Sequence, residues 1–321
     1  MNRFDPRQIK EQADQRLQAA AYSPRRLVLL HTGIALVCSL VLTLISYFLN
    51  HQVSGTGGLA GIGTRSVLQS MQSVLSLALT IILPFWEFGF IAAAMRYARQ
   101  EEVAPRNLLT GLRRFAPLLR LQLLQGAVYL LLLIAAAQLA STVVMLTPLG
   151  AGMMELMESL MQNQDFIQTG LFPEEMLEQL IRAAIPVYAV SGLLFALAAI
   201  PVSYRLRLAP YMVLDGQSRA LAAMVTSNRK MKGNCVGFFK LDLLFWWYWL
   251  LQGVCSLLAF GDALLPALGL QLPMDPEAAM FLFYGLQLAG SLALAYLWRA
   301  PVETTYATAY DTLTGEPKTE E

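Results

Sequence analysis

The stretch YRLRLAPYMVLDGQSRALAAMVTSNRKMKGNCVGFFKLDLL, residues 204–244, decides the fold. It contains the end of one apolar segment, a basic helix with apolar positions at helical spacing, and the start of the next apolar segment. Asp215 or Ser218 is expected to cap the basic helix, and Gly233 with Asn234 is expected to end it. Its apolar side is expected to contain Leu221, Met224, Val225 and Met231. The pattern predicts two membrane spans joined by an amphipathic helix on the membrane surface.

The composition of the whole chain agrees with a membrane location. Apolar residues make up 56% of the 321 residues and charged residues 14%, whereas an average soluble domain has about 25% charged residues. Three cysteines at positions 38, 235 and 255 are too few and too scattered for a disulfide framework or a thiolate metal site. We therefore expect an integral membrane protein without a metal or another cofactor.

Six apolar segments are long enough to cross about 30 Å of hydrocarbon at about 1.5 Å per residue. The fold class is thus all-α and polytopic, in a single integral-membrane domain. The expected spans are residues 27–49, 67–98, 118–146, 183–208, 236–260 and 278–298.

The connections between the spans have distinct characters. Amphipathic surface helices are expected between spans 2 and 3 and between spans 4 and 5, and an acidic, methionine-rich helical segment at 153–181 between spans 3 and 4. A glycine-rich loop is expected at 50–63. Residues 1–26 are expected to form a weakly amphipathic surface helix started by Asp5 and Pro6, and the residues after 298 to form a polar tail.

The distribution of basic residues predicts the orientation. All but two of the 23 lysine and arginine residues lie on one side of the expected spans; the two exceptions are Arg65 and Arg182. The positive-inside rule therefore places both termini in the cytoplasm. Several inner basic residues are expected to contact anionic lipid headgroups, and no nucleic-acid partner is expected. They are Arg106, Arg113, Arg114, Arg229, Lys230 and Lys232.

The two inner connections resemble each other. LLTGLRRF at 108–115 aligns with MVTSNRKM at 224–231, and RLQLL at 120–124 aligns with KLDLL at 240–244. This pattern indicates a duplicated unit of span, surface helix and span, covering residues 67–146 and 183–260. Chance similarity between two basic amphipathic segments is the alternative.

Four blocks of sequence resemble the bacterial integral-membrane family called domain of unknown function 975. They are APYMVLD at 209–215, NRKMKGN at 228–234, FFKLDL at 238–243 and TYATAYDTL at 305–313. The acidic segment at 153–181 departs from the family pattern. The chain is similar, more distantly, to the membrane domains of glycerophosphodiester phosphodiesterases, which points weakly toward lipids. The resemblance implies a multi-pass bacterial membrane protein and transfers no catalytic residue.

Glu87 is the most conspicuous ionisable residue inside an expected span. It lies nine residues before Arg96, or about 13 Å along a helix from the inner membrane surface. An ionisable group at such a depth costs at least about 2.5 kcal/mol unless it is paired or neutral. Glu87 is therefore either a proton or cation site, a structural partner of Arg205 or Arg207, or a protonated acid that is hydrogen-bonded to a neighbouring helix. The full candidate polar site comprises Glu87, Gln125, Arg205, Arg207 and Asp242, and for Asp242 a structural role is favoured.

Catalytic chemistry has few candidate residues. His31 and His51 are the only histidines, and the sequence contains no metal-ligand cluster, nucleophile motif or phosphate-binding loop. We therefore expect no enzymatic activity. Two functional hypotheses remain: a non-enzymatic membrane scaffold or envelope-homeostasis factor, and a small transporter or lipid-handling protein that uses Glu87.

Overall fold

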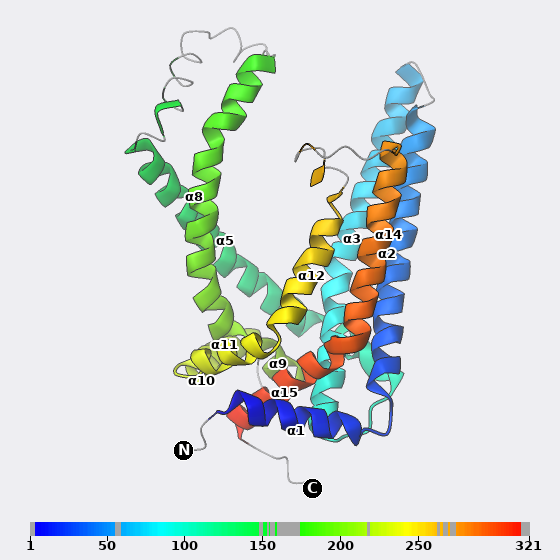
Figure 1. Cartoon of the computed structure of the whole chain (residues 1–321), viewed down its shortest axis with the longest axis vertical. Helices are drawn as coiled ribbons and strands as arrows, with labels where there is room; N and C mark the ends of the chain where they lie inside the picture. The colour runs from blue at the N-terminus through cyan, green and yellow to red at the C-terminus, as the bar shows by residue number, and fades with distance from the viewer. Residues whose placement is uncertain are drawn as a thin grey trace.

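The computed structural model describes residues 4–54, 59–147, 150–152, 154, 158, 174–216, 219–261, 264, 265, 269 and 274–315. These residues form helices and connections without a β-strand (Figure 1). The predicted acidic helical segment at 153–181 lies largely outside the described residues. In chain order, the elements are α1 Pro6–Gln18, α2 Pro24–Ser54, α3 Leu59–Ala98, the 3-10 helix η1 Pro105–Leu109, α4 Thr110–Arg113, α5 Phe115–Met145, α8 Glu174–Leu206, α9 Ala209–Leu214, α10 Ala220–Met231, α11 Cys235–Leu244, α12 Trp246–Leu258, α14 Pro276–Leu294, the π-helix η3 Ala295–Arg299 and α15 Ala300–Thr314.

Five helical segments of the described chain are long and apolar enough to cross a membrane, and the bent pair of α11 and α12 would be a sixth. The all-helical class and the presence of several possible spans are therefore confirmed. The loop expected at 50–63 was predicted too long, because α2 continues to Ser54 and α3 already begins at Leu59.

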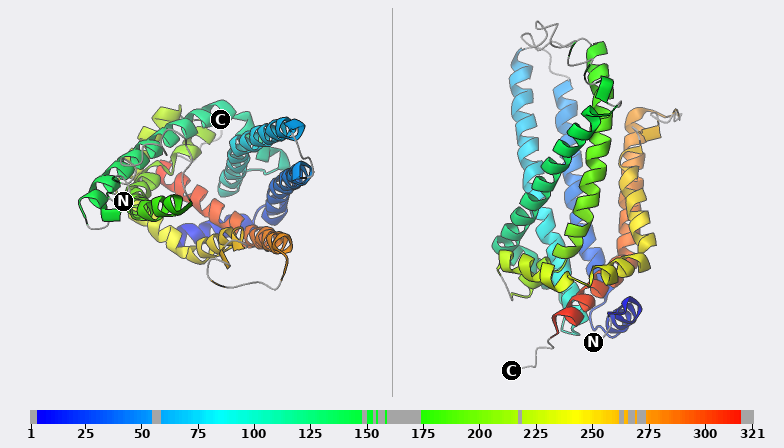
Figure 2. Two further views of the ribbon diagram at one scale, coloured as in Figure 1. Left: turned by 90° about the horizontal axis from the view of Figure 1, so that it is seen from above. Right: turned by 90° about the vertical axis from the view of Figure 1, so that its left-hand side faces the viewer.

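The helices are arranged in two groups that meet at one end, here called the base. Helix α5 packs along α8, and this hairpin contacts α9, α10 and α11 at the base. In the other group, α2 contacts α3 and α14, and α14 contacts α12. Figures 1 and 2 show the two groups diverging away from the base, where both chain termini lie.

The fifth predicted span is not one straight helix. Its two parts, α11 and α12, are bent by 70°, and α11 runs across the base (Figure 1). Helix α12 has 13 residues, which corresponds to about 20 Å and is shorter than the hydrocarbon core. The bend arises because Phe238 and Leu241 of α11 are buried in the base, which holds this helix across the bundle.

Helix α1 begins as predicted but faces a different environment. The Asp5 side chain accepts a hydrogen bond from the Arg7 backbone at 3.0 Å, and Pro6 occupies the first turn. The apolar residues Ile9 and Ala13 are buried within the protein, where α1 packs on α15 and α11. The apolar side of α1 therefore faces the protein core, and the expected location of this helix on the membrane surface stays a prediction.

Helix α15 replaces the predicted polar tail, and that prediction was wrong. Nine of its 15 residues are buried, and it contacts α1 and α3. Alanine and threonine make up most of the buried set, so neighbouring helices approach its backbone closely. Gly315 ends the helix in a left-handed conformation with φ of 65°.

The connection between α3 and α5 is docked into α3 instead of forming an amphipathic helix on lipid. It consists of the five-residue η1 and the four-residue α4. A Cβ atom at Gly89 would lie 1.8 Å from the Leu108 backbone oxygen, and one at Gly111 would lie 1.9 Å from the Phe85 backbone oxygen. Glycine at both positions thus permits the backbones to touch.

The basic helix of the opening stretch forms as α10, with a different buried side. Met224 and Met231 are buried as predicted, but Leu221 is 62% exposed and Val225 is 53% exposed. Asp215 does not cap α10; it ends α9, while Ser218 lies outside the described residues. Gly233 follows α10 with φ of 91°, which agrees with the predicted stop. The internal repeat stays a prediction.

Candidate functional site

Several ionisable residues of the base lie on one side of the continuous helical segment formed by η3 and α15. Arg299 ends η3, and Glu303, Tyr306 and Tyr310 follow at intervals of four, three and four residues, which places all four on one helical face. Groups from α3, α8, α9 and α11 meet this face. The contacts form three clusters, which we name after Arg99, Asp242 and Glu87.

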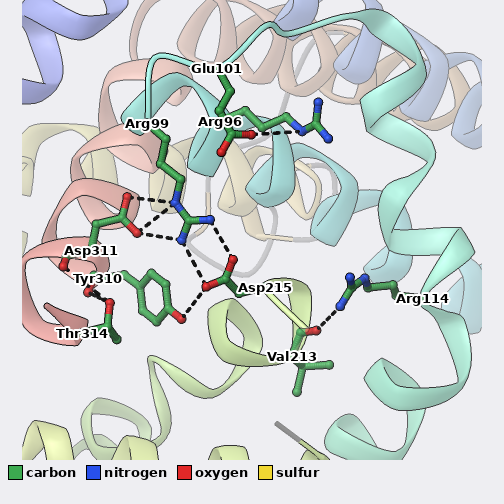
Figure 3. Close-up of polar contacts among 9 residues, drawn as sticks. All are labelled: Arg96, Arg99, Glu101, Arg114, Val213, Asp215, Tyr310, Asp311 and Thr314. Atoms are coloured by element: carbon green, nitrogen blue, oxygen red, sulfur yellow. Dashed lines mark hydrogen bonds and ion pairs between the residues drawn. The ribbon is translucent and has the colours of Figure 1, made fainter. Parts of the chain in front are cut away.

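The Arg99 cluster joins the ends of α3, α9 and α15 (Figure 3). The guanidinium of Arg99 donates to Asp311 from Nη2 at 2.8 Å and from Nε at 3.1 Å. It also donates to Asp215 from Nη1 at 2.7 Å and from Nη2 at 3.2 Å. The Tyr310 hydroxyl adds a bond to Asp215 at 3.3 Å. A planar guanidinium that binds two carboxylates fixes the direction of both partner helices.

The contacts with two carboxylates also determine the charge state of Arg99. Burial by itself would lower the pKa of Arg99, but the hydrogen bonds with Asp215 and Asp311 outweigh it and raise the pKa above its usual value. Arg99 therefore remains charged at every accessible pH. Nearby, the Nη1 of Arg114 donates to the Val213 backbone oxygen at 2.9 Å (Figure 3). Arg114 is half-buried and holds α9; its location at the membrane surface stays a prediction.

The Asp242 cluster joins α8, α11 and α15. Asp242 accepts a hydrogen bond from Arg207 at 2.7 Å and further bonds from the hydroxyls of Tyr204 and Tyr306. The Arg207 guanidinium also lies 4.1 Å from the centre of the Tyr306 ring, a cation–π contact. This arrangement agrees with the structural role favoured for Asp242 and brings it together with Arg207.

The Glu87 cluster joins α3 to η3. Glu87 forms an ion pair with Arg299, whose guanidinium lies 4.8 Å from the centre of the Phe90 ring. The predicted partners Arg205 and Arg207 were wrong: Arg207 pairs with Asp242, and Arg205 is exposed. Arg299 follows the sixth span and lies 212 positions from Glu87 in the sequence, so no local pattern indicates that the two residues pair.

Gln125 is half-buried on α5, and none of the contacts described for the three clusters includes it. The remaining predicted surface residues behave as basic surface groups, since their side chains are exposed. They are Arg106, Arg113, Arg229, Lys230 and Lys232.

A histidine–tryptophan contact ties α2 to α3 beside the Glu87 cluster. His31 is fully buried and stacks on Trp86 with ring centres 5.1 Å apart. Its Nε2 lies 3.0 Å from the Trp86 backbone oxygen, and Trp86 Nε1 donates to the His31 backbone oxygen at 3.0 Å. Because a carbonyl only accepts, Nε2 carries the proton, and Nδ1 has no hydrogen-bond partner among the described residues.

Sequence reasoning missed most members of the clusters. Arg99, Arg299 and Asp311 were placed in a connection or a tail, where charged residues usually face water. For Arg299, a signal existed in the spacing of the polar residues 299, 303, 306 and 310, which repeats with a helical period and indicates a helix instead of a tail. In the part of the chain that the structure describes, no group of three or more histidine, cysteine, aspartate or glutamate residues is placed to hold a metal ion.

The fold and its ion-paired base define a helical protein with several segments suited to crossing a membrane. A family model described as "Protein of unknown function (DUF975)" matches residues 4–316. The chain therefore belongs to this uncharacterised family, as its motifs indicated. No curated protein and no solved structure matches the chain. The more distant similarity to phosphodiesterase membrane domains stays a prediction.

Proposed function

We propose that this chain is a non-enzymatic protein of the bacterial cytoplasmic membrane, acting as a scaffold or envelope-homeostasis factor. One observation supports the proposal most directly: the predicted candidates Glu87, Arg207 and Asp242 are all bound in ion pairs between helices. A catalytic acid or base needs free access to a substrate, whereas paired groups hold helices together.

The basic surface groups support the proposed orientation with the base toward the cytoplasm. Arg229, Lys230 and Lys232 lie at the end of α10 and beside it, and all three are exposed. Each basic residue near an anionic membrane surface contributes about 1 kcal/mol of attraction. Anionic lipid headgroups are therefore the proposed partner of this surface, and both termini would lie in the cytoplasm.

A second function, that of a small transporter or lipid-handling protein, is favoured by one observation at Glu87. Its side chain remains 48% exposed although it is paired with Arg299. A carboxylate that keeps an open side has room for a proton or a cation.

The substitution Glu87→Gln separates the two functions. If the protein is a scaffold, the variant should be less stable, because Arg299 loses its partner. The proton flux across the membrane of vesicles that contain the protein should not change. The control is Glu102→Gln, since Glu102 is exposed next to the base. Loss of a flux that the wild type carries, with normal abundance and stability, would contradict the scaffold and support transport.

A further inference from the structure

Glu303 occupies an unusual position among the acids of the base. It lies one helical turn after Arg299 on the same face of α15 and is half-buried. Among the residues that the structure describes, none forms a hydrogen bond or ion pair with its carboxyl group. Arg299, the nearest cation along the helix, is instead bound to Glu87 of α3.

The charges around Glu303 do not balance. Arg207 is already paired with Asp242, so Arg299 is left as the counter-charge for two carboxylates, Glu87 and Glu303. The tyrosines near Glu303 supply no positive charge. The ionisable groups within electrostatic reach of Glu303 are Arg299, Glu87, Arg207, Tyr211, Tyr248 and Tyr306.

Phe90 fixes which carboxylate Arg299 meets. The π-helix η3 ends at Arg299 and regular α-helix follows from Ala300, so Arg299 and Glu303 keep the (i, i+4) spacing of one helical face. The contact of Arg299 with the face of Phe90, at 4.8 Å from the ring centre, holds the guanidinium on the α3 side. Glu303, one turn further along the helix, is thereby left without this guanidinium as its partner.

We propose that the Glu87, Arg299 and Glu303 cluster is a proton-binding site and that Glu303 carries the proton. A half-buried carboxylate without a partner is costly when charged, and binding one proton removes that cost. The neutral acid leaves Arg299 fully available to Glu87. This inference goes beyond a scaffold, which needs no titrating group.

Release of the proton has a structural consequence. An ionised Glu303 attracts Arg299 across one helical turn and competes with Glu87 for it. The ion pair between α3 and η3 therefore weakens as pH rises through the pKa of Glu303. Protonation of this one residue couples pH to the contact between α3 and the α14–α15 segment.

Infrared spectroscopy of the full chain in lipid vesicles tests the proposal through the carbonyl band of a protonated carboxylic acid. Spectra are recorded between about pH 5 and about pH 9, where exposed carboxylic acids are ionised over most of the range. The wild type is expected to show the band near neutral pH and to lose it on alkalinisation. Glu303→Gln should lack this titrating band, and Glu102→Gln should retain it.

The substitution Glu87→Gln gives a second, directional readout. It frees Arg299 for Glu303, so the midpoint of the band should fall by at least about one pH unit, a tenfold change in proton affinity. If Glu303→Gln does not fold, Glu303→Asp keeps the acid, and its band should persist with a changed midpoint. Absence of the band in the wild type, or a titrating band unchanged in Glu303→Gln or Glu303→Asp, would overturn the proposal.

Discussion

Removal of the Arg99 side chain is expected to destabilise the base strongly. Arg99→Ala leaves Asp215 without its main partner, and the Asp215 side chain is only 5% exposed. Breaking a buried ion pair by deleting one partner costs about 3–5 kcal/mol, because the other charge stays buried. The Arg99 side chain itself is 25% exposed, so water screens part of this effect. We expect a loss of about 3 kcal/mol in the free energy of unfolding.

The two acids of the Arg99 cluster should differ in importance. Asp215→Asn should cost about 2 kcal/mol, since it removes the buried half of the site. Asp311→Asn should cost less than about 1 kcal/mol, because the Asp311 side chain is 23% exposed and its pair with Arg99 is partly screened. Arg99→Lys should fall between wild type and Arg99→Ala, since an ammonium cannot bind both carboxylates through a planar fork.

Denaturant titration of the purified protein in detergent micelles measures these changes, with Arg106→Ala as the control because Arg106 is exposed. The double variant Arg99→Ala with Asp215→Asn should be no less stable than Arg99→Ala, since the two residues share one interaction. Equal stability of Arg99→Ala and Arg106→Ala would refute the assignment of Arg99 as the central clamp. Equal costs for Asp215→Asn and Asp311→Asn would refute the argument from burial.

Two further changes test the packing of the base. Gly111→Ala should prevent accumulation of folded protein, because its Cβ would lie 1.9 Å from the Phe85 backbone oxygen. Gly126→Ala, in the open part of α5, should instead stabilise the protein by about 0.5–1 kcal/mol. The yield and the unfolding midpoint of each variant measure these effects. Tyr306→Phe should cost about 1.5–3 kcal/mol, since it removes a hydrogen bond to the charged Asp242, and Tyr188→Phe should cost close to nothing because Tyr188 is 75% exposed. Equal midpoints for the two tyrosine variants, or a normal yield of Gly111→Ala, would count against this packing.

The membrane helices were predictable because their signal is local. A run of apolar residues such as that at 27–49 is enough to indicate a helix of spanning length. The bend at Phe245 was not predictable in the same way, because the stretch 236–260 is apolar throughout. It depends on the burial of Phe238 and Leu241 and on the hydrogen bond between Asp242 and Tyr306 of α15, neither of which is visible in a hydropathy profile.

The ion pairs of the base could be predicted only in part. The pairing of Asp242 with Arg207 connects residues 35 positions apart in the opening stretch, whereas Glu87 and Arg299 are separated by 212 positions. Distant pairs depend on how α15 folds back under the bundle. Alanine and threonine make α15 less apolar than the membrane helices. For this reason the segment was predicted to be an exposed tail, whereas it forms a buried helix.

The sidedness of the base is the central claim of the account, and cysteine labelling measures it directly. In a chain carrying Cys38→Ala and Cys255→Ala, Cys235 at the start of α11 is the remaining thiol. A membrane-impermeant thiol reagent should label it in inverted vesicles and leave it unlabelled in intact cells. An added Asp275→Cys, just before α14 at the opposite end (Figure 1), should react in intact cells. Labelling of Cys235 in intact cells would contradict the proposed orientation.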